Sequence, residues 1–298
     1  MYQIKKRRLV AFVITFLFSL LCVQSSFAKS PVFKVSKGSD YLYLGGTIHL
    51  LSPNDYPLPS GFQEAFNDAE HVYFETDIDA VTSPEVQAKM ASFATLPEGQ
   101  SLKGILNEDT YSQLEEFLAE RQIPVAAFDR LTPAAASLGL AVLELQRLGL
   151  GNPASGVDQF YSLKTKDAEK TALYLESIDE QIGFLNEFNK ADPNLVIQSS
   201  IESSEDLSAN WEKGLKAWRA GDLETLGDSL GADDMRADFP DIYRVLVTDR
   251  NNRWLVEIKE MFDSKEVELL LVGALHLADD IGLVEQLREE GYKVEQLD

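Results

Sequence analysis

Two short apolar runs, at 42–44 and 269–272, have the length and composition of buried strands. Each run leads into the pattern Gly-x-x-His-Leu, which places His49 after the first and His276 after the second. Glycine lets the backbone turn tightly or approach a ligand closely where a strand ends. Ligands bind at the carboxyl ends of strands in open α/β sheets, so neighbouring strands would bring both histidines to one site. The alternative is two unrelated strand-end histidines. Repetition of the pattern in a chain with three histidines favours the shared site.

Other strands are predicted where apolar, aromatic and β-branched residues cluster between polar turns. The segments 33–35 and 41–44 form a predicted hairpin, and a further strand is expected at 291–295. Two more strands end in acid: 71–77 contains Glu75, and 172–176 closes on Glu176. Glu75 is therefore expected beside His49 at the carboxyl end of an adjacent strand.

Helical spacing of apolar residues dominates the middle of the chain. Asn107 is a predicted helix cap, Thr132-Pro133 opens a helix, and Pro240 starts a long helix that reaches Met261. Strands thus cluster near the two ends and around residue 174. The predicted fold is α/β, with a sheet built from the amino- and carboxyl-terminal segments and a helical insertion at about 100–262. We expect this insertion to cap the strand ends and shape a substrate cleft.

The first residues have the pattern of a targeting segment. Lys5-Lys6-Arg7-Arg8 precedes an apolar stretch, 9–23, and Ser26-Phe27-Ala28 resembles a cleavage site. Residues 1–28 are therefore a predicted signal peptide, and 29–298 a single periplasmic or secreted domain. A retained membrane anchor is the alternative, although the apolar stretch is short for a span of about 20 residues.

Charge and cysteine content exclude several functions. The formal net charge is −22, and removal of 1–28 takes away four basic residues and no acidic one. A chain this acidic repels nucleic acid and anionic membrane surfaces. The only cysteine, Cys22, would leave with the signal, which excludes thiol chemistry and disulfides. No Gly-x-Ser-x-Gly elbow, phosphate-binding glycine loop or helical zinc-protease motif is present.

The remaining candidate chemistry belongs to the two imidazoles and a carboxylate. His49, His276 and Glu75 are suitable ligands for a divalent transition metal such as Mn, Co or Zn. Glu75 itself, or else Glu176, would serve as the base. His71 opens its strand at the opposite end from Glu75 and is left out.

Five further residues are candidates for ligand binding: Asp158, Arg250, Arg253, Gly46 and Gly273. Asp158 is a possible supporting acid, with a solvated carboxylate as the alternative. The two arginines would bind a substrate carboxylate or pair with a glutamate. Gly46 and Gly273 are the motif glycines, expected where the backbone approaches a bound cofactor.

An ordered series of motifs resembles the TraB/GumN family over about 33–297. It comprises Gly-Thr-Ile-His-Leu ending at 50, Phe-Glu-Thr-Asp at 74–77, Gly-Val-Asp at 156–158, Leu-Glu-Ser at 175–177 with Gln181, Arg-Asn-x-Arg-Trp at 250–254 and Val-Gly-Ala-Leu-His-Leu at 272–277. The family is similar to the TIKI proteases and, distantly, to ChaN-like and erythromycin esterase-like proteins. The resemblance implies metal-dependent hydrolysis centred on the paired histidines and the glutamate.

The predicted function is an exported metal-dependent hydrolase, a peptidase acting on a peptide or small-molecule substrate. One alternative is a binding protein for haem or another metal complex, with the histidines as axial ligands. A second is a catalytically inactive interaction module. The sequence does not specify the substrate, the metal or the oligomeric state.

Overall fold

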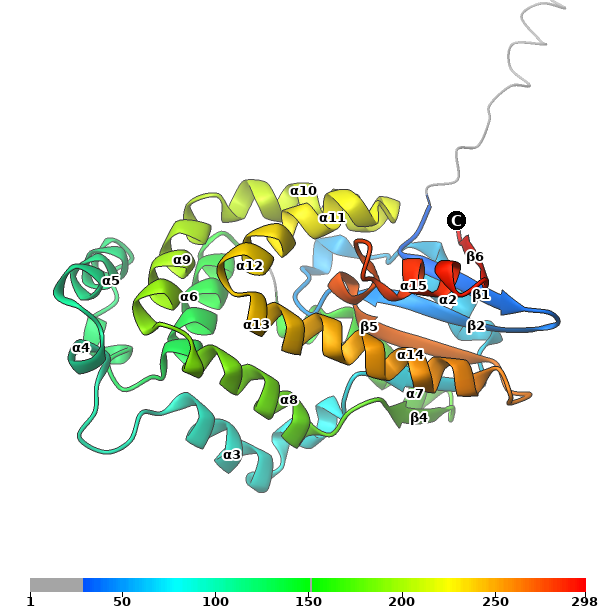
Figure 1. The fold of residues 1–298 in the computed structure, drawn as a ribbon, viewed down its shortest axis with the longest axis horizontal. Coiled ribbons are helices and arrows are strands. Elements are labelled where there is room, and N and C mark those ends of the chain that lie inside the picture. The colour runs from blue at the N-terminus through cyan, green and yellow to red at the C-terminus, as the bar shows by residue number, and fades with distance from the viewer. Residues whose placement is uncertain (1–28, 151) are drawn as a thin grey trace, which may run out of the picture.

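The computed structural model describes residues 29–150 and 152–298 (Figure 1). The predicted signal peptide, 1–28, lies outside this part of the chain. None of the helices in the described ranges is long and apolar enough to cross a membrane.

A six-stranded mixed sheet forms the centre of the fold, with strand order β4-β3-β5-β2-β1-β6. The strands are β1 (Val32–Lys37), β2 (Asp40–Thr47), β3 (His71–Phe74), β4 (Thr171–Tyr174), β5 (Glu268–Gly273) and β6 (Lys293–Gln296). β1 pairs antiparallel with β2 and with β6, and the four strands from β2 to β4 are parallel. β5 lies between β2 and β3, so the two strands that lead into the histidine motifs are neighbours, with Thr47 opposite Gly273.

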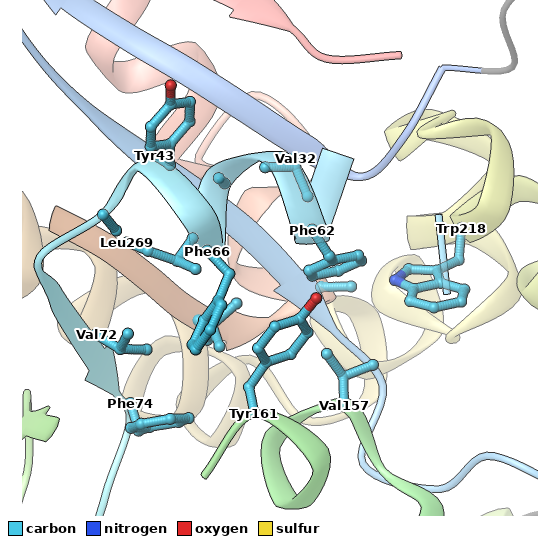
Figure 2. Packing of buried hydrophobic residues seen from close by; sticks show 14 of the residues in the cluster. Val32, Tyr43, Phe62, Phe66, Val72, Phe74, Val157, Tyr161, Trp218 and Leu269 are labelled. Atoms are coloured by element: carbon cyan, nitrogen blue, oxygen red, sulfur yellow. The ribbon is translucent and has the colours of Figure 1, made fainter. Parts of the chain in front are cut away.

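Alternating apolar residues build a core on each face of the sheet. On one face Tyr43 and Leu269 pack with Phe62, Tyr161 and Trp218 from the helices (Figure 2). On the other face the residues one position along, Leu44 and Leu270, pack against the helix at 249–261 and the helix at 283–289. The strands are therefore buried on both sides, which is why they read as continuous apolar runs.

Capping residues fix the helix starts. Asn107 accepts a hydrogen bond from the Thr110 backbone N–H, and Thr132 accepts one from Ala135 ahead of Pro133, as predicted. The helices are α2 (Ser60–Asp68), α3 (Pro84–Ala94), α4 (Leu102–Ile105), α5 (Glu108–Glu120), α6 (Pro133–Arg147), α7 (Val157–Asp167), α8 (Ile178–Leu185), α9 (Pro193–Glu205), α10 (Leu207–Ala220), α11 (Leu223–Ser229), α12 (Ala232–Asp238), α13 (Pro240–Tyr243), α14 (Asp249–Met261) and α15 (Leu283–Glu289).

The segment at 100–262 is less uniform than the sequence indicated. β4 lies inside it and joins the sheet beside β3, and α14 packs its Trp254 and Ile258 against the sheet. A π-helical turn, η6 (Arg244–Thr248), joins α13 to α14, so the long helix predicted from Pro240 to Met261 is continuous. The helices from α9 to α12 lie to one side of the sheet in Figure 1.

The fold class is confirmed as mixed α/β, with the chain ends contributing to the sheet, and only strand boundaries differ. β3 ends at Phe74 and β4 at Tyr174, before the acids that were predicted to close them. Pairing nevertheless continues, because Glu176 N donates to Glu75 O at 2.9 Å. The two glutamates therefore leave adjacent strands side by side.

Candidate functional site

Both histidine motifs end at Gly273. A Cβ atom on this glycine would lie 3.1 Å from Glu75 Oε1, 3.6 Å from His276 Cδ2 and 3.7 Å from His49 Nε2. Three side chains from distant parts of the sequence thus surround one glycine at the carboxyl end of β5. The parallel pairing of β2, β5 and β3 explains the convergence, because it aligns the ends of these strands.

His49 is held by a carboxylate. Its Nδ1 lies 2.7 Å from Asp158 Oδ2, and Asp158 Oδ1 accepts a hydrogen bond from Thr47 Oγ1 at 2.9 Å. Gly156, just before α7, packs on the His49 carbonyl, where a Cβ would lie 2.3 Å from the oxygen. The negative charge of Asp158 raises the pKa of His49 to about 9, although desolvation opposes it. His49 Nε2 therefore points toward Gly273 while Nδ1 donates to Asp158.

Glu75 is buried and remains ionised. Its Oε1 accepts from the Gly273 backbone N–H at 2.6 Å, and its Oε2 accepts from Gln181 at 3.2 Å. Desolvation raises the pKa of this carboxyl, but the opposing attraction of Arg250, His276 and other partners lowers it to about 2. The carboxylate is thus fixed between the two histidine motifs.

Arg250 is buried in the middle of the cluster. Its Nη2 donates to Glu75 Oε2 at 2.6 Å and to Glu176 Oε2 at 2.9 Å, and its Nε donates to Glu176 Oε1 at 2.9 Å. Its Nη1 lies 3.0 Å from the Leu246 carbonyl and 3.0 Å from His276 Nε2. All five N–H donors of a guanidinium therefore have acceptors.

His276 lies in the single turn η7 (Ala274–Leu277) and is buried. Its Nδ1 is 2.7 Å from Asn251 Oδ1, and the Asn251 amide nitrogen donates to the carbonyl oxygens of His276 and Ile281. The Asn251 oxygen must then accept from Nδ1–H, which leaves Nε2 as the acceptor for Arg250. Burial lowers the pKa of His276 to about 3, so its ring is neutral. The ring packs on Trp254 with centroids 4.5 Å apart.

Glu176 is enclosed by arginines. It accepts from Arg250 and from Arg253 Nη2, and Arg253 also pairs with Glu180 at 3.2 Å. Burial raises the pKa of Glu176, against the attraction of Arg250. Of the two uses predicted for the arginines, the structure shows the pairing with glutamates.

The donor chemistry at this site suits a divalent transition metal. Two imidazoles have Nδ1 hydrogen-bonded to an oxygen, the arrangement that orients metal-binding histidines, and a carboxylate lies beside them. The space over Gly273, which a Cβ would fill, is bordered by His49 Nε2 and Glu75 Oε1. As the side chains stand, however, no three His, Cys, Asp or Glu residues in the described ranges are grouped closely enough to hold a metal ion. His276 Nε2 and Glu75 Oε2 instead face Arg250.

Two predicted positions differ from expectation. Gly46 does not border the cluster: a Cβ there would lie 3.2 Å from Ala274 Cα, and its carbonyl accepts from Trp218 at 2.7 Å. Its close approach is to neighbouring protein, because η7 packs directly on β2. Asp158 orients His49 and is mostly buried, so it does not line an open substrate surface.

The sequence reasoning gave no role to Asn251, Gln181 or Thr47, although each contacts a central residue. Asn251 was detectable from spacing. Residues 250, 251, 254, 255 and 258 are the buried face of α14, so Asn251 shares a helical stripe with apolar core residues. A polar side chain on such a stripe needs a buried partner.

The fold and these contacts define a mixed α/β protein with a His, Glu and Arg cluster at the carboxyl ends of its parallel strands. The chain belongs to the TraB/PrgY/gumN family, whose family model matches residues 31–296.

Similar proteins share about a quarter of the sequence. "Uncharacterized protein YbaP" of Escherichia coli (strain K12) is 24% identical over 251 residues, covering 84% of this chain and 89% of that protein. "Metalloprotease TIKI1" of Homo sapiens is 25% identical over 304 residues, covering 85% and 59%. "Metalloprotease TIKI2" of Xenopus tropicalis is 24% identical over 305 residues, covering 85% and 57%. The chain thus spans less than two thirds of the metalloprotease relatives. No solved structure matches it.

Proposed function

We propose that this protein is a metal-dependent hydrolase, a peptidase, with His49, Glu75 and His276 at its centre. The observation that carries the proposal is the convergence of the three side chains around Gly273. The similarity to proteins named metalloproteases supports the reaction class. Substrate identity is not part of that similarity, and a small molecule with a hydrolysable acyl bond would suit the same chemistry.

His49 Nε2, His276 Nε2 and an oxygen of Glu75 would hold the metal, which we expect to be Mn, Co or Zn. When bound, such an ion lowers the pKa of a water molecule and polarises a carbonyl group. Asp158 and Asn251 fix the two rings through Nδ1, so that each ring presents Nε2. The backbone N–H of Gly273 positions Glu75.

One carboxylate must accept the proton that water loses in hydrolysis. Glu75 lies beside the histidines, whereas Glu176 is held by Arg250 and Arg253. The variants Glu75→Gln and Glu176→Gln separate these roles. Loss of metal in Glu75→Gln assigns Glu75 as a ligand, while retained metal without hydrolysis in either variant assigns that residue as the base.

An apolar cavity of about 180 Å³ beside the site supports a substrate with an apolar group. Ile48, the neighbour of His49, lines it together with residues of α6, α10 and α11, including Leu145, Trp211 and Leu226. We propose that the helical segment at 100–262 covers the strand ends here and selects the substrate. Filling this cavity should then change substrate preference and leave metal binding intact.

Export is part of the proposal and depends on residues 1–28 alone. The partners we propose are a peptide or small-molecule substrate, with neither nucleic acid nor a stable membrane anchor. Amino-terminal sequencing of the mature protein tests the export step. Retention of Met1 in that material would refute it.

Elemental analysis and a visible spectrum of the purified protein test the metal assignment. About one Mn, Co or Zn per chain and no Soret band are expected. A Soret band would instead indicate a haem-binding protein, and absence of metal an inactive module. The decisive variant is His276→Ala, measured for metal content, because undiminished binding would remove the basis for the assignment. His71→Ala is the matched control, since His71 opens β3 at the far end from Glu75.

A further inference from the structure

Arg250 competes for the groups that the proposed metal requires. Its guanidinium donates to Glu75 Oε2 at 2.6 Å and lies 3.0 Å from His276 Nε2. A metal bound by His276 uses the same Nε2 lone pair that accepts from Arg250. The two cations therefore cannot share this nitrogen.

The arginine is also well satisfied where it lies. Its remaining donors bond to Glu176 and to the Leu246 carbonyl, and its guanidinium carbon lies 4.7 Å from the Trp254 ring centroid. The side chain is 9% exposed. A buried and fully bonded guanidinium is costly to displace, because water is not available to replace its partners.

The charges near the site already balance without a metal. The carboxylates of Glu75 and Glu176 face the guanidinium groups of Arg250 and Arg253, and Asp158 faces His49. A divalent ion would add two positive charges next to Arg250. Removal of Arg250 alone would leave excess negative charge on Glu75 and Glu176, which attracts a cation.

We propose that Arg250 is an internal cation that occupies the site in the metal-free protein and sets its metal affinity by competition. This inference rests on the proposed metal site at His49, Glu75 and His276. Metal binding then requires Arg250 to release His276 Nε2, and the guanidinium weakens binding in proportion to the cost of that release. Arg250 is a positioning residue for Glu75 and Glu176 in the metal-free state.

The test is titration of the full mature chain with Mn²⁺, Co²⁺ and Zn²⁺ by calorimetry, with the visible absorption of Co²⁺ as a report on coordination. Arg250→Met removes the charge and keeps much of the side-chain length. Arg253→Met is the matched control: it makes the same change one turn along α14, at a residue that pairs with Glu176 and Glu180 only. Arg250→Gln is a second neutral variant that retains an N–H donor, for use if Arg250→Met fails to fold.

Both Arg250 variants should bind metal roughly tenfold more tightly than the wild type, or better, while Arg253→Met changes affinity by less than about threefold. Adding His276→Ala to Arg250→Met should abolish the gain. Unchanged or weaker binding in the Arg250 variants, with measurable binding by the wild type, overturns this inference alone. An equal gain in Arg253→Met also overturns it, because the effect would then be one of overall charge. Absence of binding in every variant overturns both the inference and the proposed metal site.

Discussion

The two Gly-x-x-His motifs bring one imidazole each to Gly273, yet the two rings have opposite surroundings. The His49 side chain is 64% exposed, and the carboxylate of Asp158 raises its pKa to about 9. The His276 side chain is 7% exposed, and burial lowers its pKa to about 3. Its Nδ1 faces the neutral amide of Asn251 in place of a carboxylate.

The comparison separates position from protonation state. The motif and its strand determine where each ring lies, because β2 and β5 are parallel neighbours. The residue opposite Nδ1, together with burial, determines whether the ring is charged. Two copies of one local pattern therefore give an imidazolium and a neutral imidazole within one site near neutral pH.

The largest predicted difference is in stability. His276→Ala should lower the free energy of unfolding by about 3 kcal/mol, since it removes packing on Trp254 and leaves Asn251 Oδ1 and Arg250 Nη1 without partners. His49→Ala should cost less than about 1 kcal/mol, because that side chain is largely exposed. Urea unfolding of both variants at neutral pH measures the difference, and equal losses would contradict the contrast in burial.

The motif glycines should differ in a related way. In Gly46→Ala the new Cβ meets Leu277 Cδ1 at 3.1 Å and Ala274 Cα at 3.2 Å, so we expect a loss of about 1–3 kcal/mol in stability. In Gly273→Ala the Cβ meets Glu75 Oε1 at 3.1 Å and borders both histidines.

We therefore expect Gly273→Ala to lose metal affinity with a stability loss below about 1 kcal/mol. Thermal unfolding and metal titration of the two variants test this pair. A strong loss of metal binding in Gly46→Ala, with none in Gly273→Ala, would show that the roles are reversed.

A smaller effect is expected from Asp158→Asn. Removing the charge should move the pKa of His49 from about 9 toward its ordinary value of 6.5, measured by NMR titration of the imidazole signals. Because the folded pKa is the higher one, the stabilisation by this pair is complete below about pH 6.5 and is lost as pH rises through about 9. Asp158→Asn should remove that decline, and an unchanged pH profile would exclude the ion pair as its cause.

The converse variant, Asn251→Asp, places a carboxylate opposite His276 Nδ1. It should raise the pKa of His276 above about 3 in the same NMR titration. In the wild type the unfolded state binds the proton first as pH falls from 6.5 toward 3, so His276 contributes a loss of stability over that window. Asn251→Asp should narrow the window, and a pKa that stays low would assign the shift to burial alone.

Much of the sheet follows from the sequence because its signals are local. Apolar runs with turn residues between them predicted the β1–β2 hairpin and the strands that lead to His49, Glu75 and His276. The convergence of the three side chains depended on one further assumption, that the terminal segments pair. Parallel pairing of β5 with both β2 and β3 meets that assumption.

The neighbours of each side chain were beyond the sequence signal. Arg250 was expected to bind substrate or pair with a glutamate, and its burial depends on α14 packing against the sheet. Gly46 was placed near a cofactor, but η7 packs against it. Such contacts join residues far apart in the chain, and their partners follow from tertiary packing that no local pattern encodes.

The position of β5 in the sheet has a consequence for folding during synthesis. β2 and β3 are made early, but the strand that lies between them is among the last parts of the chain to be made. Until then each has an edge without its final neighbour, and such edges pair readily with other chains. A domain whose central contacts join distant segments also folds slowly. His49 therefore waits for nearly the whole polypeptide before it can meet His276, and the site is completed among the last steps of folding.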